Sequence, residues 1–344
     1  MPDSQPPFEP EHTTGNAPVL VYDVGGSHIS AAICHPHTFA LHGISRAPLP
    51  AAPEASPSAG HFSAASFGRL IHALGEAAAN SANLRLQSLA GAALAMPGPF
   101  DYDRGISQMR HKLTSLFGVD LKSSLAVRFL WQPEQVRFVN DAAAFLLGEM
   151  GAGAAKGYAR AIGITLGTGI GCAFGVADPA GSRVLTEGQG VPPGGEIWNL
   201  PYNGATVEDF VSTRFLRHQF QQLTGLEAEV STIADTAKGD HPCPEPPLPP
   251  SVPSLDPNDP YAAHCRARQA FQDFGRHLGL ALNQHAAAFR PDIVVMGGGI
   301  ARASALFLPA TRKALAFETK LAISALMDEA PLAGAGVHWF STEK

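Results

Sequence analysis

The chain has 344 residues and a mass of 36.0 kDa, with 45% of its residues hydrophobic and 16% charged. This length gives room for about two domains with substantial cores. The composition excludes disordered, collagen-like and coiled-coil proteins, each of which has a different signature. The 24 basic and 30 acidic residues give a net charge of −6. That charge disfavours nucleic-acid binding, because there is no basic surplus to neutralise phosphates.

The cysteines and the apolar runs indicate the compartment. Cys34, Cys172, Cys243 and Cys265 form no Cys-x-x-Cys pair, so neither a disulfide framework nor a zinc ribbon is expected. Residues 1–16 have neither the basic start nor the apolar core of a secretory signal. No apolar run reaches the roughly 18 residues that span a membrane. We therefore expect a cytoplasmic protein with no membrane partner.

Short apolar runs that stop at glycine, proline or asparagine predict β-strands, and stretches of helical composition lie between them. After a loose tail over residues 1–18, the predicted strands are Val19–Val24, Ile29–Cys34, Leu89–Met96, Val136–Val139, two within Ala161–Val176, and Ile293–Met296. The predicted helices are 61–84, 142–150 and 271–289, with one more starting near Ile300. This order is typical of an α/β protein.

Two segments of the chain share one pattern. Val19–Cys34 and Ala161–Val176 each consist of an apolar strand, a glycine-rich turn with one hydroxyl, and a second apolar strand. An internal duplication of an α/β unit is the economical interpretation. Two unrelated hairpins are the alternative that these residues leave open.

One stretch is not part of a core. Residues 241–260 include nine prolines in twenty positions, which excludes a regular helix or a central strand. We interpret this stretch as an extended surface insertion that acts as a spacer rather than as a site for a proline-recognising partner.

Three glycine-rich turns follow strands, at 25–27, 167–169 and 297–299. Backbone N–H groups in such turns can approach a phosphate closely, and three of them together predict a nucleotide site. The sequence has no GxxxxGK[ST] motif, which excludes a P-loop enzyme. The turn at 167–169 runs into a strand rather than a helix, which argues against a dinucleotide-binding fingerprint.

Two aspartates lie beside these elements. Asp23 precedes the first turn, where a carboxylate can hold the magnesium of a nucleotide through water, or can simply close the turn. Asp141 lies between a strand and a helix, which suits a helix N-cap. The same position suits a base that accepts the proton of a sugar hydroxyl during phosphoryl transfer. Asn140 beside it can hydrogen-bond the same sugar.

Taken together, the motifs of this chain resemble those of the ROK family of sugar kinases and repressors. They are DVGGSHI at 23–29, AMPGPF at 95–100, NDAAAFLLGE at 140–149, TLGTGIG at 165–171, GGEI at 194–197, VEDFVS at 207–212 and VVMGGGIA at 294–301. Their order and spacing match the family from about Val19 to the carboxy-terminal region. Each motif is weak alone, and the ordered set is specific.

The resemblance implies the actin-like, ribonuclease-H-like ATPase fold, an α/β fold with two lobes from a duplicated α/β unit and a cleft between them. The small lobe would be 19–139, rejoined by about 318–344, and the large lobe would be 140–317, with the insertion at 241–260. The implied activity is phosphorylation of a hexose or N-acetylhexosamine by ATP with Mg²⁺. The implied partner is a small-molecule sugar and not a nucleic acid, and a homodimer is left open.

The resemblance also implies roles for individual residues, with Asp141 as the general base. The implied sugar-binding residues are Asn140, Asp141, Glu196, Glu208, Asn199, Gly98 and Lys112. The implied ATP-binding residues are Asp23, Gly25, Gly26, Ser27, Gly167, Thr168, Gly169, Gly298 and Gly299. The last two would lie at the adenosine end, and magnesium carried by ATP would lie near Asp23.

The loop after Glu196 departs from the family pattern. Many members have GEIGH, whose histidine completes a zinc site with three cysteines, but this chain has Asn199 at that position and no cysteine before Glu208. No structural zinc is expected. Trp198 has two interpretations: it stacks on or walls the sugar pocket, or it packs in an ordinary core.

A second departure is Lys112, which stands where the family commonly has an asparagine facing the sugar. The cation either shifts preference towards an acidic or phosphorylated sugar, or points to solvent. Lys112 and Asn199 favour an alternative function: a kinase-like protein that binds sugar or nucleotide for regulation, with little or no turnover. Asp141 and the phosphate turns oppose it. A repressor is disfavoured, because the residues before Val19 are too few for a helix-turn-helix domain.

Overall fold

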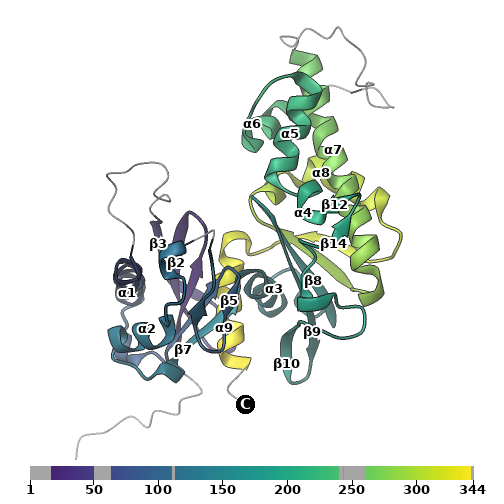
Figure 1. Cartoon of the computed structure of the whole chain (residues 1–344). Coiled ribbons are helices and arrows are strands. Elements are labelled where there is room, and N and C mark those ends of the chain that lie inside the picture. Colours follow the sequence, from purple (N-terminus) through teal and green to yellow (C-terminus); the bar gives the residue numbers. More distant parts are fainter. Residues whose placement is uncertain (1–16, 50–62, 111–112, 240–242, 244–259, 342–344) are drawn as a thin grey trace, which may run out of the picture. The chain divides into compact units, whose positions relative to one another are not determined.

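Figure 1 shows the computed structural model, which describes residues 17–49, 63–110, 113–239, 243 and 260–341. Two compact units are present: unit 1 comprises Met1–Asn140 and Ala335–Lys344, and unit 2 comprises Asp141–Gly334. The predicted tail before Ala17, Lys112, and the proline-rich insertion apart from Cys243 and Pro260 lie outside the described residues. Within the described ranges, no helix has the length and apolar character needed to cross a bilayer.

The sheet of unit 1 has the strand order β3-β2-β1-β4-β7. The first three strands form an antiparallel meander, and β4 and β7 run parallel to β1. The strands are β1 (Val19–Val24), β2 (His28–Cys34), β3 (Leu41–Pro48), β4 (Ala92–Met96) and β7 (Val136–Asn140), with a small hairpin of β5 (Phe100–Asp101) and β6 (Ile106–Ser107).

Helices cover both faces of this sheet, because successive strand residues point to opposite sides. The Tyr22 hydroxyl donates to the Ile71 carbonyl in α1 at 2.8 Å, and α2 packs beside α1. On the other face, Arg137 in β7 donates to the Trp339 carbonyl in α9 at 2.8 Å. The helices are α1 (Ala64–Ser81), α2 (Leu121–Phe129) and α9 (Ala330–Ser341), which begins in unit 2.

The sheet of unit 2 has the order β10-β9-β8-β13-β14, again an antiparallel meander followed by two parallel strands. The two units therefore have the same strand order and the same pattern of parallel and antiparallel strands. This confirms the predicted duplicated α/β unit and excludes two unrelated hairpins. The strands are β8 (Arg160–Leu166), β9 (Ile170–Asp178), β10 (Gly181–Leu185), β13 (Ile293–Gly297) and β14 (Lys320–Ile323), with β11 (Pro201–Tyr202) and β12 (Ala205–Thr206) as a separate hairpin.

The two faces of the second sheet bury different helices. Ile162, Ile164 and Phe174 are buried against α7 and its neighbours, whereas Ala161 and Val295 pack against α3. The helices are α3 (Asp141–Gly151), α4 (Val207–Phe210), α5 (Thr213–Thr224), α6 (Val230–Ala237), α7 (Pro260–His285) and α8 (Ser304–Ala314). Short 3₁₀ turns occur at Leu86–Ser88, Thr114–Leu116, Pro133–Gln135, Pro193–Gly195, Ala287–Phe289, Ile300–Ala303 and Met327–Glu329.

The segment that returns to unit 1 is shorter than expected. Residues 318–334 belong to unit 2, because β14 pairs with β13 and so lies at the edge of the second sheet. The chain re-enters unit 1 only at Ala335, within α9.

The cysteine expectation requires a correction. A disulfide joins Cys243 to Cys265 near the start of α7, whereas Cys34 and Cys172 are buried and unpaired with other cysteines. A separation of 22 residues has no spacing signature, so the sequence alone did not indicate this pair. The bond connects the beginning of the proline-rich insertion to the helix that follows it.

α3 and α9 cross with their backbones in direct contact. A Cβ added at Gly334 would overlap the Ala144 carbonyl, and one added at Gly148 would overlap the Ala330 carbonyl. Only glycine allows the two helices to approach this closely.

We expect thiol titration of the unfolded, unreduced protein to detect Cys34 and Cys172 only. Prior reduction should raise the count to all four cysteines. Four reactive thiols without reduction would show that Cys243 and Cys265 are not bonded.

We expect Gly334→Ala to lower the free energy of unfolding by about 1–3 kcal/mol, because its methyl group must displace backbone. The measurement is denaturant unfolding of the purified variant. Gly299→Ala is the matched control, since a Cβ there has nothing within 4 Å. Equal losses in the two variants would contradict the close crossing.

Candidate active site

The turn at 167–169 packs against a carboxylate. It joins β8 to β9 and closes with a hydrogen bond from the Gly167 N–H to the Gly169 carbonyl at 2.9 Å. Glu208, in α4, accepts from the Ile170 N–H at 3.3 Å. A Cβ on Gly169 would overlap this carboxylate. A side chain at position 169 would therefore displace this carboxylate, and Glu208 lies at the beginning of β9.

A second carboxylate, that of Glu196, lies near the same strand. Glu196 accepts from the Trp198 indole N–H at 2.7 Å, and the Glu208 N–H donates to the Trp198 carbonyl at 3.0 Å. Burial, and to a lesser extent the nearby Glu196 carboxylate, raises the pKa of the Cys172 thiol in β9. Glu196 and Glu208 are thus linked through Trp198. Asn199, the next residue, is exposed in the same loop.

Asp141 adjoins these residues at the first position of α3. Its Oδ1 accepts from the Ala142 N–H at 2.9 Å, a bond to the adjacent residue, whereas an N-cap side chain accepts from the second or third residue of a helix. A Cβ added to Gly171 in β9 would lie 3.1 Å from the Ala142 Cβ. The helix start that carries Asp141 therefore touches the same short piece of β9 that contacts Glu208 and lies near Glu196.

The first glycine turn belongs to unit 1. The Gly25 N–H donates to the His28 carbonyl at 3.0 Å, and the Ser27 hydroxyl lies 3.2 Å from the His28 Nδ1. Gly26 and Ser27 are exposed, and a Cβ on Gly26 would meet nothing within 4 Å. The turn thus presents open backbone to solvent. Asp23, half-buried, precedes it in β1.

Gly98 and Asn140 lie together in unit 1. The Asn140 Nδ2 donates to the Tyr102 hydroxyl at 3.1 Å, and that hydroxyl donates to the Met96 carbonyl at 3.2 Å. A Cβ at Gly98 would lie 3.5 Å from the Tyr102 oxygen. β1, β4 and β7 are parallel, so Asp23 near the end of β1 and this group share the carboxyl edge, where ligands bind in α/β sheets.

The last glycine turn adjoins the second one. Gly298 has a φ of +85°, and a Cβ there would lie 2.5 Å from the Leu166 carbonyl, immediately before Gly167. Gly299 follows with open space around its α-carbon. Unit 2 thus brings together two of the three predicted phosphate turns, and unit 1 holds the third.

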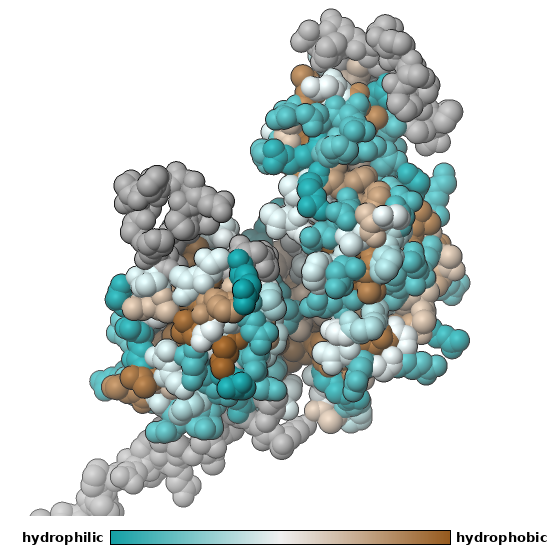
Figure 2. Space-filling view, viewed as in Figure 1, coloured by the Kyte–Doolittle hydropathy of each residue, from teal (hydrophilic) through white to brown (hydrophobic). Residues whose placement is uncertain are grey.

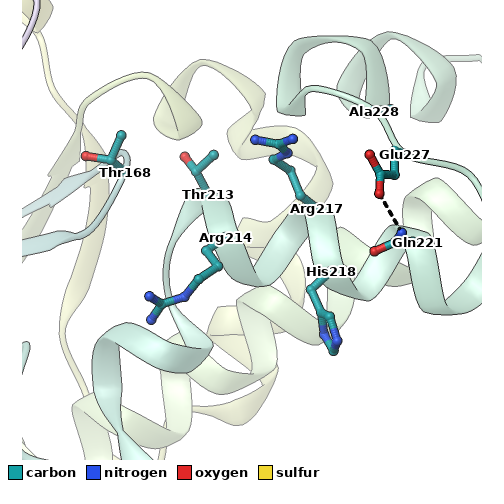
Figure 3. Close-up of a pocket in the computed structure, with 8 residues that line it drawn as sticks. All are labelled: Thr168, Thr213, Arg214, Arg217, His218, Gln221, Glu227 and Ala228. Carbon is teal, nitrogen blue, oxygen red and sulfur yellow. Dashed lines mark hydrogen bonds between the residues drawn. The ribbon is translucent and has the colours of Figure 1, made fainter. Parts of the chain in front are cut away.

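A pocket of about 430 Å³ opens beside Thr168 and follows α5 (Figure 3). Thr213 anchors α5 to the turn, because its N–H and its hydroxyl both donate to the Gly167 carbonyl, at 2.9 and 2.7 Å. Apart from Ala228 the lining is polar, and Figure 2 shows a mostly hydrophilic surface over α5 and α6. The lining residues are Thr168, Thr213, Arg214, Arg217, His218, Gln221, Glu227 and Ala228.

The two arginines of the pocket are held by surface ion pairs. Arg214 pairs with Asp209 at 2.6 Å, and Arg217 pairs with Glu229 at 3.3 Å. Donation from Thr206, with a smaller contribution from Arg214, holds the pKa of Asp209 below its usual value. Exposed ion pairs of this kind contribute about 0–1 kcal/mol to stability. A ligand can therefore take the place of Asp209 or Glu229 as the partner of its arginine.

Sequence reasoning missed three parts of this region. Tyr102 follows the AMPGPF motif by two residues. Its contact with Asn140 exists only because the folded chain brings these two distant segments together. Thr213 and Arg217 lie just after the VEDFVS motif, in a segment with no helix predicted from sequence. Among the described residues, no cluster of three or more histidine, cysteine, aspartate or glutamate side chains could hold a metal ion. Lys112 lies outside the described residues.

Comparisons with known proteins find similarity to sugar kinases. The ROK family model matches residues 67–188. A glucokinase of Thermotoga maritima is 28% identical over 258 residues, covering 70% of this chain and 75% of that protein.

Solved structures extend the similarity to most of the chain. A ROK hexokinase from Thermus thermophilus superposes with a TM-score of 0.68 at 23% identity, covering 93% of this chain and 97% of that one. A ROK family glucokinase from Streptomyces griseus, in complex with glucose and AMPPNP, gives a TM-score of 0.66 at 19% identity, covering 93% and 98%. The chain is thus similar to ROK family sugar kinases over its first half, and it shares the actin-like fold of the solved ROK kinases.

Proposed function

We propose that this protein is an ATP-dependent sugar kinase that transfers the γ-phosphoryl group of Mg-ATP to a hydroxyl of a hexose or N-acetylhexosamine. The observation that carries the proposal is the grouping of Asp141, Glu196 and Glu208 at the start of β9, directly after the glycine turn at 167–169. Carboxylates bind sugar hydroxyls, and the open turn suits phosphate. The glucokinase relative and the glucose–AMPPNP complex support this pairing of ligands.

In this proposal the sugar is held mainly by hydrogen bonds. Glu196 and Glu208 accept from its hydroxyls, and Asn199 lies in the same loop. Asn140, positioned by Tyr102, contributes from the end of β7, and the absence of a side chain at Gly98 leaves space beside it. Lys112 remains a proposed sugar contact that lies outside the described residues.

Asp141 acts as the general base. Its carboxylate is oriented by the Ala142 N–H, and the N-terminus of α3 favours its negative charge. As the sugar oxygen bonds to the γ-phosphorus, its proton passes to Asp141 and the bond to ADP breaks. Positioning of this kind dominates phosphoryl transfer. The protonated Asp141 returns its proton to solvent after the product leaves.

The phosphates of the donor lie on the glycine turns. The exposed Gly26, Ser27 and Thr168 leave backbone and hydroxyl donors accessible, and Gly25, Gly167 and Gly169 complete the two turns. Asp23 is the carboxylate beside the first turn that would hold magnesium carried by ATP, and that ion would neutralise charge on the phosphates.

The nucleoside part of the donor occupies the pocket along α5. The pocket begins at Thr168 and runs past Thr213, Arg217 and Gln221, which are spaced at i, i+4 and i+8 and so span about 12 Å of one helix face. The Arg217 guanidinium offers a flat surface for a base. Gln221 and Glu227 offer donors and acceptors for its edge. Gly298 and Gly299 approach the adenosine end from β13.

We expect Asp141→Asn to reduce sugar-dependent ADP release by about 10²–10⁴-fold, because the amide cannot accept the proton. The readout is ADP formation from Mg-ATP across glucose, mannose and N-acetylhexosamines, with ATP binding by calorimetry expected to persist. Asparagine caps helices as well as aspartate does, so the fold should be retained.

Asp120→Asn is the matched control, because Asp120 is another aspartate at the start of a helix that accepts from a backbone N–H, that of Ser123 in α2 at 2.9 Å, outside the site. Wild-type turnover in Asp141→Asn would contradict its role as the base. Sugar binding by the wild type without any ADP release would favour the regulatory function instead.

We expect Arg217→Ala to raise the KM for ATP by about tenfold, equivalent to about 1.4 kcal/mol of donor binding, without changing the KM for sugar. Steady-state kinetics with each substrate varied in turn provides the measurement. Arg183→Ala is the control, since Arg183 forms an exposed ion pair with Asp178 on the β9–β10 hairpin. An unchanged KM for ATP would place the nucleoside elsewhere.

A further inference from the structure

Trp198 is an exposed aromatic side chain between two site residues. It has 42% of its surface exposed, whereas its neighbour Ile197 is fully buried and anchors the loop. By contrast, Trp339 is only 2% exposed, and Trp131 stacks on Phe129 in unit 1. Ordinary core packing, one of the two interpretations of the sequence, therefore does not describe Trp198.

The orientation of this indole is fixed. Its N–H donates to Glu196 at 2.7 Å, and a hydrogen bond to a carboxylate is stronger than one between neutral groups. Its backbone carbonyl accepts from the Glu208 N–H at 3.0 Å. Trp198 is thus held at both its main chain and its ring, by the two glutamates that the proposed function assigns to the sugar.

The hydrogen-bonding needs of the indole are already satisfied, so what it presents to a ligand is apolar ring surface. A pyranose is amphipathic: its hydroxyls point around the ring, and its axial hydrogens form an apolar face. Aromatic rings with a bonded N–H are suited to ligands of this character. A ring fixed before binding also loses little conformational entropy when the ligand arrives.

We propose that Trp198 is a specificity-determining residue, on which the apolar face of the pyranose stacks while Glu196 and Glu208 accept from the hydroxyls at its rim. This inference rests on the proposed sugar kinase function. The indole also occupies one carboxylate oxygen of Glu196, which leaves the other for the sugar. The site therefore selects pyranoses that keep one face free of axial substituents.

The test uses the intrinsic fluorescence of Trp198 and the kinetics of its variants. Titration of the wild-type protein with glucose, mannose or N-acetylglucosamine should change tryptophan emission. In Trp198→Phe the change should disappear while calorimetry still detects the sugar, because a stacking ring remains. Trp198→Ala should raise the KM for sugar by about tenfold or more and leave the KM for ATP unchanged.

Tyr261→Ala is the matched control, since Tyr261 is equally exposed, at 42%, on α7 of the same unit. Its sugar KM should equal that of the wild type. If Trp198→Ala turns over sugar with an unchanged KM, or the emission change persists in Trp198→Phe, the stacking role is wrong and the kinase function stands. If the wild type neither binds nor phosphorylates any of these sugars, both proposals fail.

Discussion

The position of Asp141 depends on a buried carboxylate near the opposite end of its helix. Glu149 is fully buried and accepts from the Ala154 N–H at 2.7 Å, the Ser324 hydroxyl at 2.5 Å, and the N–H groups of Ala325 and Leu326 at 3.3 and 3.2 Å. An unpaired carboxylate would be costly at such a site, and these donors offset that cost. They tie α3 to the segments after α3 and after β14, so the proposed base is carried on a helix that cannot shift freely.

Duplication of one α/β unit produced two glycine turns but not two equivalent sites. In unit 1 the described chain after β3 resumes with α1, whereas in unit 2 the chain after β10 forms the Glu196 loop and α4–α6 before it reaches α7. That added stretch supplies both carboxylates proposed to bind the sugar, the Trp198 ring and the pocket along α5. The fold shared by the two units provides strand edges and turns suited to phosphate. The additional segment of unit 2 provides the groups that would determine ligand specificity.

Local signals predicted much of the fold from sequence. The run Val19–Val24 and the turn at 167–169 are defined by their own composition. Asp141 was identifiable as a candidate site residue because a strand, an aspartate and a helix follow one another. Contacts between distant segments were not predictable: the α3–α9 crossing depends on Gly148 meeting Ala330. The exposure of Trp198 was equally hidden, because tryptophan is highly buried on average and only the fold shows which surface a loop occupies.

The order of the two units along the chain has a consequence for protein synthesis. Unit 2 is one continuous segment, whereas unit 1 needs Ala335 onward to be complete. Gly336 lies against Cys34 with no room for a Cβ, and Trp339 closes over the Arg137 side chain. Domains usually fold from the amino terminus as they emerge from the ribosome. Here the unit whose translation begins first is the last that can be completed, because its apolar sheet stays uncovered until the part of α9 from Ala335 onward has been made.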